Sequence, residues 1–461
     1  MSLHGESSHN EMKLERTIGL PGGVALVIGG VIGMGIYALI AAVSAQAGSA
    51  LWLAFLIAII ISIIGVLPIV QIASALPRAG AGYLYTSRLL NPYLGSLTSY
   101  LAILGGASST AMVALGVAQY IGPYLPFAIP ELGIAIILPI LFFFLYLFGL
   151  RLAASLQVVL AIHLVIALIV YAICGTISQG IEMSFTLPQG AGGFIMAIIL
   201  SYSVCMGFQV IAEMGEEMHN ARKNIPLSLL IGGSIVLVIY ILVGSVFVKS
   251  VPYNFEAIKA MKAPLMESGA LFLPAWFVLV LSAGAISAGL TSFNAGAIAL
   301  PRELFSQARD RLVPPFLGRV HKSGSPVNAV AAFFIFVILL LLLGKSIDFY
   351  GVVTAVGILF MTSLLAIAAI RLPTKFPDRY ASSYFKLSKI TLVIVAVIAV
   401  LSSLGFMFIV LTELPVVAYI YIACCILVTA YYFLRVRWLE KQGIDFKAQM
   451  KEMPGFDEEI V

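Results

Sequence analysis

The sequence predicts an all-α integral membrane protein with twelve transmembrane helices. Of its 461 residues, 61% are hydrophobic and only 10% are charged, and the mean hydropathy is +1.08. A soluble domain carries about 25% charged residues, so the composition excludes an ordinary soluble protein. Apolar runs of about 20 residues, the length that crosses a bilayer, also recur along the whole chain.

Twelve of these runs are long enough to be predicted spans. They are 19–45, 51–75, 94–120, 132–149, 153–177, 193–213, 227–248, 273–300, 326–343, 348–370, 390–412 and 414–434. An even number of spans puts both ends of the chain on one side of the membrane. The tails are then 1–18 and 435–461.

The distribution of basic residues predicts which side that is. With the N-terminus inside, only four of the 26 basic residues fall in outer loops. These four are Lys249, Lys259, Lys262 and Lys345. Because lysine and arginine concentrate in cytoplasmic loops, we expect a protein of the cytoplasmic membrane with both termini inside. This bias also explains the net charge of +5, and it predicts lipid rather than nucleic acid as the surroundings.

The first predicted span contains a run of glycines that should interrupt its helix. Gly29, Gly30, Gly33 and Gly35 lie within seven residues. Each glycine inside a helix costs roughly 1 kcal/mol relative to alanine, and hydrocarbon offers no water to the freed backbone groups. Such a break survives where it is buried in protein or lines a cavity. It therefore predicts a site for a polar ligand.

A second break is predicted in the sixth span, over 201–208, around Gly207. Two interruptions five spans apart are typical of an inverted repeat of five plus five helices. The repeats would be 19–177 and 193–370, followed by two accessory helices over 390–434. The alternative interpretation is that Gly207 only lets two helices pack closely.

The chain lacks the motifs of an ATP-driven pump or an enzyme. No Walker A motif and no catalytic constellation is present, and nothing predicts a cofactor. Cys174, Cys205, Cys424 and Cys425 lie in apolar runs without metal-ligand spacing, so we interpret them as small core residues rather than metal ligands. A transporter driven by a gradient, or an exchanger, fits these observations.

Four segments resemble motifs of the amino acid–polyamine–organocation superfamily of permeases, with the arginine/agmatine antiporter particularly similar. They are Gly33-Met34-Gly35-Ile36-Tyr37, Pro77-Arg78-Ala79-Gly80-Ala81-Gly82-Tyr83-Leu84-Tyr85, the stretch from Glu216 to Pro226, and the stretch from Val313 to Pro326. The resemblance implies a LeuT-type fold in which substrate is held between the broken first and sixth helices.

Two facing breaks would suit an amino acid. A half-helix that begins near Ile36 presents unpaired N–H groups and its positive dipole end to a carboxylate, in a segment that includes Gly33 and Gly35. Carbonyls freed near Ile32 and Gly207 could accept from the ammonium group. We therefore predict a small-molecule amino acid as substrate, with an amine as the alternative.

Met34 stands where the family usually has a small hydroxyl residue or alanine. Its thioether cannot donate a hydrogen bond, and it fills space. Either the substrate is small and apolar, or backbone alone holds its carboxylate, or it is an amine without a carboxylate.

The resemblance implies further substrate contacts on the third and eighth spans. Ser109 aligns with an asparagine that touches substrate in the antiporter, and Met112 lies almost one turn further on. A hydroxyl that bonds its own backbone one turn back is the alternative for Ser109. Ser292 and Gly296 match positions that face substrate, although Gly296 replaces a large aromatic residue and so puts arginine stacking in doubt.

On the sixth span, Ser203 stands where the antiporter has a tryptophan, and Phe208 matches a gating aromatic residue of related permeases. An ordinary core or lipid-facing phenylalanine is the alternative for Phe208. Gln209 replaces a glutamate implicated in proton coupling in the antiporter. Glu216 and Glu217 are expected to pair with nearby Arg222 and Lys223 across the following loop.

His163 is the candidate coupling residue. It is the only histidine deep in a predicted span, and ionisable residues at that depth are functional candidates. Some proton-coupled members have a lysine in this helix where relatives bind sodium, and it aligns with His163 or Leu164. We expect proton coupling or exchange, with sodium as an alternative. A neutral histidine bonded to a neighbouring helix is the structural alternative.

Three other functions remain open at this point. The same fold could carry a polyamine or ethanolamine-type amine, but a cation without a carboxylate favours an acidic pocket, and none is evident at the breaks. A non-transporting amino acid receptor commonly has longer tails than the two predicted here. A major-facilitator carrier also has twelve spans, but its charged signature between spans two and three is not found.

Overall fold

The computed structural model describes residues 16–78, 80–121, 129–147, 150–261, 263–321, 325–446 and 450. Their regular structure is helical, apart from one isolated bridge between Ile18 and Met218. Most of the N-terminal tail and the end of the C-terminal tail lie outside the described residues.

The helices of the first half are α1 (Leu20–Val31), α2 (Met34–Ala47), α3 (Leu51–Ala75), α4 (Ala81–Leu89), α5 (Pro92–Ile121), α6 (Glu131–Leu147), α7 (Leu150–Ser178) and α8 (Gly190–Val204). The helices of the second half are α9 (Ala221–Ser250), α10 (Phe255–Lys259), α11 (Pro264–Gly269), α12 (Ala275–Ala299), α13 (Pro301–Arg309), α14 (Val327–Leu342), α15 (Ile347–Lys375), α16 (Pro377–Ala381), α17 (Lys389–Glu413) and α18 (Pro415–Lys441). Short 3₁₀ helices are η1 (Gly48–Ala50), η3 (Met206–Glu213) and η4 (Pro315–Gly318).

The helices have the length and composition of membrane spans. Among the described residues, nine helical stretches are long and apolar enough to cross a membrane. Three shorter apolar helices, α6, α8 and α14, fall at the predicted fourth, sixth and ninth spans. The all-α membrane class is thus supported, while the count of twelve spans stays a prediction. The last helix also runs seven residues past its predicted end at 434, to Lys441.

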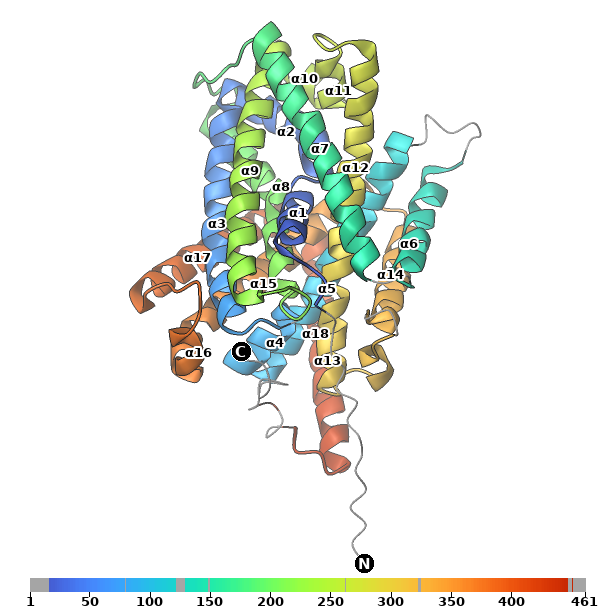
Figure 1. The fold of residues 1–461 in the computed structure, drawn as a ribbon, viewed down its shortest axis with the longest axis vertical. Helices are drawn as coiled ribbons and strands as arrows, with labels where there is room; N and C mark the ends of the chain where they lie inside the picture. The colour runs from blue at the N-terminus through green and yellow to red at the C-terminus, as the bar shows by residue number, and fades with distance from the viewer. Residues whose placement is uncertain are drawn as a thin grey trace, which may run out of the picture.

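The long helices form a bundle whose two ends carry different short helices (Figure 1). Helices α4, α13 and α16 gather at one end, and α10 and α11 lie at the other. We call these the α4–α13 end and the α10–α11 end. This separation agrees with the predicted alternation of the loops across a membrane.

Helix α1 lies near the middle of the bundle (Figure 1), where it packs against α7, α9, α12 and η3. The two last helices lie outside this centre. Helix α17 packs on α3 and α15, and α18 packs on α5. Large apolar side chains such as Leu401, Phe408 and Leu427 are more than 60% exposed there, as expected for surfaces that face lipid.

Candidate binding site at two helix breaks

The first predicted span is interrupted where its glycines predict. Helix α1 ends at Val31, Ile32 leaves the helical region with ψ 75°, and Gly33 is extended with φ −104° and ψ −155°. Helix α2 then begins at Met34, two residues earlier than expected. No side chain caps its N-terminus, so its first N–H groups and its positive dipole end are presented at the break.

The sixth predicted span changes helix type instead of unwinding. Helix α8 ends at Val204, and after Cys205 the chain continues as the eight-residue 3₁₀ helix η3. Such helices seldom exceed three or four residues, and longer ones often mark a hinge or local strain. The tighter backbone, rather than an open loop, forms the second break.

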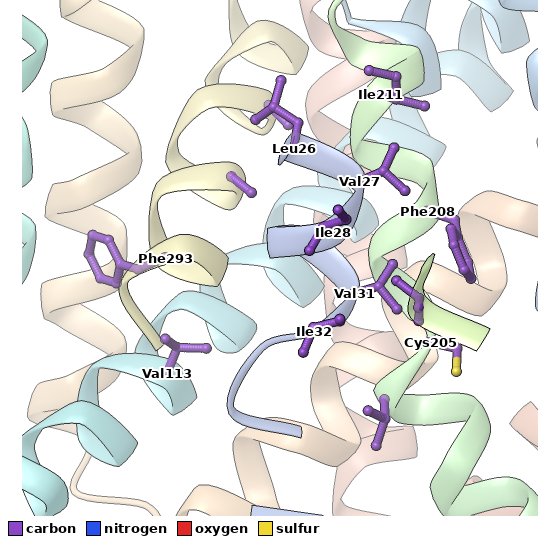
Figure 2. Packing of buried hydrophobic residues seen from close by; sticks show 14 of the residues in the cluster. Leu26, Val27, Ile28, Val31, Ile32, Val113, Cys205, Phe208, Ile211 and Phe293 are labelled. Atoms are coloured by element: carbon purple, nitrogen blue, oxygen red, sulfur yellow. The ribbon is translucent and has the colours of Figure 1, made fainter. Parts of the chain in front are cut away.

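The two breaks touch each other through backbone. A Cβ placed on Gly207 would overlap the carbonyl group of Gly30, near the end of α1. A Cβ on Gly35 would lie 2.7 Å from a methyl carbon of Val204. Figure 2 shows the end of α1, with Val31 and Ile32, beside the segment that carries Cys205 and Phe208. Glycine at 207 therefore permits an approach that any side chain would block.

Two hydroxyl groups hold carbonyls at the end of α1. Ser292 on α12 donates to the Gly29 carbonyl at 3.1 Å, and the fully buried Tyr240 on α9 donates to the Val31 carbonyl at 2.8 Å. Gly33 lies against Ser292, because a Cβ there would overlap the hydroxyl oxygen. Sequence reasoning missed Tyr240. Its signal was a lone tyrosine in the apolar run 227–248, since a buried phenol needs a partner.

Met34 lies between the third and eighth predicted spans. It is 6% exposed. A Cβ on Gly116 of α5 would be 3.0 Å from its terminal methyl carbon, and one on Gly289 of α12 would be 3.4 Å from its sulfur. Two glycines on facing helices therefore leave the room that this side chain fills. Next to it, Ile36 is fully buried.

Three other predicted residues lie against different neighbours. A Cβ on Gly351 of α15 would be 3.3 Å from the Met112 sulfur, and Gly296 faces Thr110 on α5. The ring of Phe208 approaches Gly233 on α9. In Figure 2 it lies on the side of its segment away from α1.

For two predicted serines, Ser109 and Ser203, the structure describes no side-chain contact with the breaks. Ser109 is half-buried on α5. For Ser109, the alternative was a hydrogen bond from its hydroxyl to the backbone one turn back. The neighbouring Thr110 makes a bond of this kind, by donating to the Gly106 carbonyl at 2.9 Å. Ser203 belongs to α8, but its side chain lies outside what the structure describes.

A small cavity lies behind the second break. Its volume is about 10 Å³, which is room for about one water molecule. Its lining comes from α3, α8, η3 and α15, namely Ser62, Gly65, Val66, Tyr202, Cys205, Phe208 and Thr362. This cavity is too small for an amino acid.

His163 joins the fifth and eighth predicted spans. Its Nδ1 atom lies 2.8 Å from the Ser287 hydroxyl oxygen on α12. Ser287 precedes Ser292 by five residues, about 7.5 Å along a helix. The contact matches the structural alternative of a histidine bonded to a neighbouring helix, and a coupling role stays a prediction.

Buried charges gather at the α4–α13 end. Arg302 and Glu217 form an ion pair at 2.6 Å with both side chains 0% exposed. Glu303 accepts from the N–H groups of Gly82 and Tyr83 at 2.8 and 2.9 Å. Three segments, which follow the predicted second, sixth and eighth spans, are thereby joined.

The expected partners of Glu216 and Glu217 were wrong. Glu217 pairs with Arg302, and Glu216 pairs with Arg309 at 2.8 Å and with Arg78 at 3.9 Å. The reason is that this turn contacts α13, whose Arg302 and Arg309 approach the two glutamates although they are distant in sequence. Burial raises the pKa of the Glu217 carboxyl above its usual value, and the positive charge of Arg302 opposes that rise.

Comparison with known proteins places the chain among transporters. The family model for amino acid permeases matches residues 18–431. An uncharacterized transporter of Mycobacterium bovis is 26% identical over 67% of this chain and 69% of its own length. The branched-chain amino acid permease BcaP of Bacillus subtilis is 24% identical over 81% of this chain and 84% of its own length. Cationic amino acid transporter 4 of Homo sapiens is 26% identical over 78% and 61%.

Proposed function

The chain belongs to the amino acid permease family, and from that premise we propose that it transports small or neutral amino acids across the cytoplasmic membrane by alternating access. The single observation that carries this proposal is the backbone contact between Gly207 and Gly30. It brings two helix breaks to one place in the middle of an apolar bundle.

The chemistry of the breaks suits the two charged groups of an amino acid. The uncapped start of α2 offers N–H groups and a positive dipole end to a carboxylate. Ser292 and Tyr240 already hold the carbonyls of Gly29 and Val31. We propose the carbonyls of Ile32 and Gly207 as acceptors for the ammonium group. Because Gly207 lies within η3, its carbonyl can serve only where that 3₁₀ helix opens.

The surroundings favour a neutral side chain on the substrate. The described contacts to the breaks come from glycine, serine, tyrosine, valine and methionine, none of which carries a charge. A cationic side chain without a partner would lose much of its solvation energy there. The resemblance to a branched-chain amino acid permease agrees with an apolar preference, whereas the resemblance to cationic amino acid transporters makes arginine and lysine the substrates to test against.

We propose a LeuT-type arrangement of twelve spans, with the α4–α13 end and both termini in the cytoplasm. The charge bias supports this orientation, because Arg78, Arg88, Arg302 and Arg309 lie at the α4–α13 end, whereas Lys249 adjoins the α10–α11 end. Ala260→Cys, at the exposed end of α10, should be labelled by an impermeant maleimide in intact cells. Ser382→Cys, after α16, is the matched control and should be labelled only after permeabilisation. The reverse pattern would overturn the orientation.

Proton coupling or exchange through His163 is the proposed driving mechanism. In support, His163 Nδ1 lies 2.8 Å from the Ser287 hydroxyl oxygen on α12, the helix whose Ser292 bonds the Gly29 carbonyl at the first break. Sodium-stimulated uptake into proteoliposomes would contradict this part of the proposal.

A ligand screen tests the substrate class. Ligand binding to the native state stabilises it by RT ln(1 + [L]/Kd), so thermal shifts of the purified protein rank amino acids and amines directly. We expect small and branched neutral amino acids to give larger shifts than arginine, lysine or polyamines. Larger shifts with polyamines would favour an amine permease. Binding without uptake into proteoliposomes would favour a receptor.

A further inference from the structure

The connection from the end of α15 to the start of α17 carries an excess of positive charge. Its one acid is Asp378, and its basic residues are Arg371, Lys375, Arg379, Lys386 and Lys389. Four of these five, all except Arg379, are exposed. Within the part of the chain that the structure describes, none of the four forms an ion pair. The connection, which we call the 371–389 loop, therefore presents positive charge that no carboxylate compensates.

Polar side chains near the end of α3 hold this loop in place. Gln71, which is 0% exposed, accepts from the Leu387 N–H at 2.7 Å. Ser74 accepts from the Phe385 N–H at 3.0 Å and donates to the Arg222 carbonyl of α9 at 2.9 Å. Buried polar groups in an apolar helix need such partners. The charged loop is thus attached to two helices, α3 and α9.

Local contacts also fix where the last two lysines of the loop lie. The Tyr380 hydroxyl donates to the Leu387 carbonyl, and Lys386 Nζ lies 5.4 Å from the centroid of the Tyr380 ring. Ser388 caps α17 with its side chain, so Lys389 is the first residue of that helix. Both lysines therefore lie where the loop meets α17.

Directly after Lys389, helix α17 presents an apolar stripe. Its side chains Ile390, Ile394, Val397 and Leu401 are 75%, 54%, 45% and 65% exposed. Their spacing of three and four residues puts them on one face of the helix. Cations followed by an exposed apolar face match a phospholipid with an anionic headgroup, whose acyl chain would lie along the stripe. A small soluble anion would match the charges alone.

We propose that the 371–389 loop and the exposed face of α17 form a binding site for an anionic phospholipid. Helix α16, within the loop, lies at the edge of the α4–α13 end (Figure 1). This end is cytoplasmic in the proposed orientation, and the cytoplasmic leaflet carries anionic lipids. Because the lipid binds the loop as it is attached to α3 and α9, bound lipid stabilises the native state. The site goes beyond the proposed function and is independent of the transported substrate.

Lipid titration of the purified full-length protein tests the site. Phosphatidylglycerol added in detergent should raise the melting temperature, whereas phosphatidylcholine with the same acyl chains and inorganic phosphate should not. In the double variant Lys386→Gln with Lys389→Gln, the apparent affinity for phosphatidylglycerol should fall about 25-fold, since each basic residue near an anionic surface contributes about fivefold. The matched control is Arg319→Gln with Lys441→Gln, which removes the same charge from exposed positions outside the loop. It should bind phosphatidylglycerol like the wild type.

Hydrogen exchange locates the bound lipid. Amides of the 371–389 loop should exchange more slowly in nanodiscs of phosphatidylglycerol than in nanodiscs of phosphatidylcholine, and amides of α10 should exchange equally in both. The double lysine variant should lose this difference.

Three results would overturn the proposal. Equal thermal shifts with phosphatidylglycerol and phosphatidylcholine would mean that the headgroup charge is not recognised. Equal losses of affinity in the two double variants would mean that only net charge matters. A shift with inorganic phosphate as large as that with phosphatidylglycerol would indicate a site for a small anion instead of a lipid. If the protein transports no amino acid, the proposed function fails, and these binding measurements still decide whether the lipid site exists.

Discussion

The middle of this protein and its α4–α13 end solve the same problem of buried polarity in opposite ways. At the breaks, the partners are backbone groups and hydroxyls, such as Tyr240 on the Val31 carbonyl. At the α4–α13 end they are full charges, such as Arg302 with Glu217, both 0% exposed. The first kind of partner is neutral and the second is ionic.

This difference in partners indicates where contacts can be rearranged at a low cost in free energy. A neutral hydrogen bond contributes a net of about 0.5–1.5 kcal/mol, so a ligand at the breaks can replace one bond by another. Removing one member of a buried ion pair costs about 3–5 kcal/mol, because the other charge is left uncompensated. We therefore expect the contacts of the charged end to resist rearrangement, whereas those of the middle can be exchanged at lower cost.

The largest expected effect is at the buried pair. Arg302→Met should lower the free energy of unfolding by about 3–5 kcal/mol, since the Glu217 carboxyl stays buried without its partner. The double variant Glu217→Met with Arg302→Met should recover most of that loss. Thermal denaturation of purified protein measures both. If the single and double variants lost the same free energy of unfolding, the proposed difference between the ionic α4–α13 end and the neutral middle would be wrong.

The loss of stability in Arg302→Met should depend on pH. Burial raises the folded-state pKa of Glu217 above its usual value. Such a group favours folding below its unfolded pKa, and that contribution is lost as pH rises through the folded pKa. Without Arg302 the pKa should rise further. The stability difference between Arg302→Met and wild type should therefore be smaller at pH 5 than at pH 8.

The next largest effect is expected at the contact between the breaks. Gly207→Ala would place a methyl group on the backbone of Gly30, so we expect ligand binding to fall below detection while the protein still inserts. Gly233→Ala is the matched control, because its Cβ would meet the Phe208 ring at an ordinary 3.5 Å. Gly35→Val should behave like Gly207→Ala. Normal uptake by Gly207→Ala would show that the breaks are not the site.

A change of specificity is expected at Met34. Met34→Ser removes the side chain that fills the space beside Gly116 and Gly289, so larger or more polar amino acids should be accepted. Competition in uptake assays should shift the preference by about tenfold, as is usual when a pocket changes by a methylene or more. If wild type prefers arginine and the variant behaves the same, the pocket is assigned wrongly.

A smaller effect is expected at His163, whose only described polar contact is the Ser287 hydroxyl. If His163 carries the coupled proton, His163→Ala should flatten the pH profile of uptake and leave substrate exchange intact. Uptake at several pH values, with and without sodium, measures this. An unchanged profile would mean that His163 only joins two helices through Ser287.

The smallest effect is expected at the exposed pair of Glu182 and Lys249, which are 3.7 Å apart. Hydrogen bonds from Ser184, and then the charge of Lys249, lower the pKa of Glu182. Its contribution is therefore present above the usual glutamate pKa and is lost as pH falls through the lowered pKa. Glu182→Gln should leave the melting temperature at neutral pH unchanged, because exposed pairs contribute little. A loss as large as that of Arg302→Met would mean that burial does not decide the cost.

The sequence by itself determined the helical membrane class, the two breaks and the family. Each depends on local chemistry: apolar runs of spanning length, glycines that weaken a helix, and short motifs. It also predicted Ser292, Gly33 and Gly207 at one place, through the resemblance. The helical class and the two breaks are found in the structure, because they do not depend on how one helix is rotated against another. Substrate binding by Ser292, Gly33 and Gly207 stays a prediction.

Only the tertiary structure decided which way the side chains point. A helix that is apolar all round carries no periodicity to reveal its buried face, so the neighbours of Met112 and Phe208, which are α15 and α9, could not be predicted. The partner of Glu217 could not be predicted either, because it is Arg302, 85 residues away in the sequence. The nearest arginine in sequence was the wrong choice because the pair that forms is the one that chain packing brings together and shields from water.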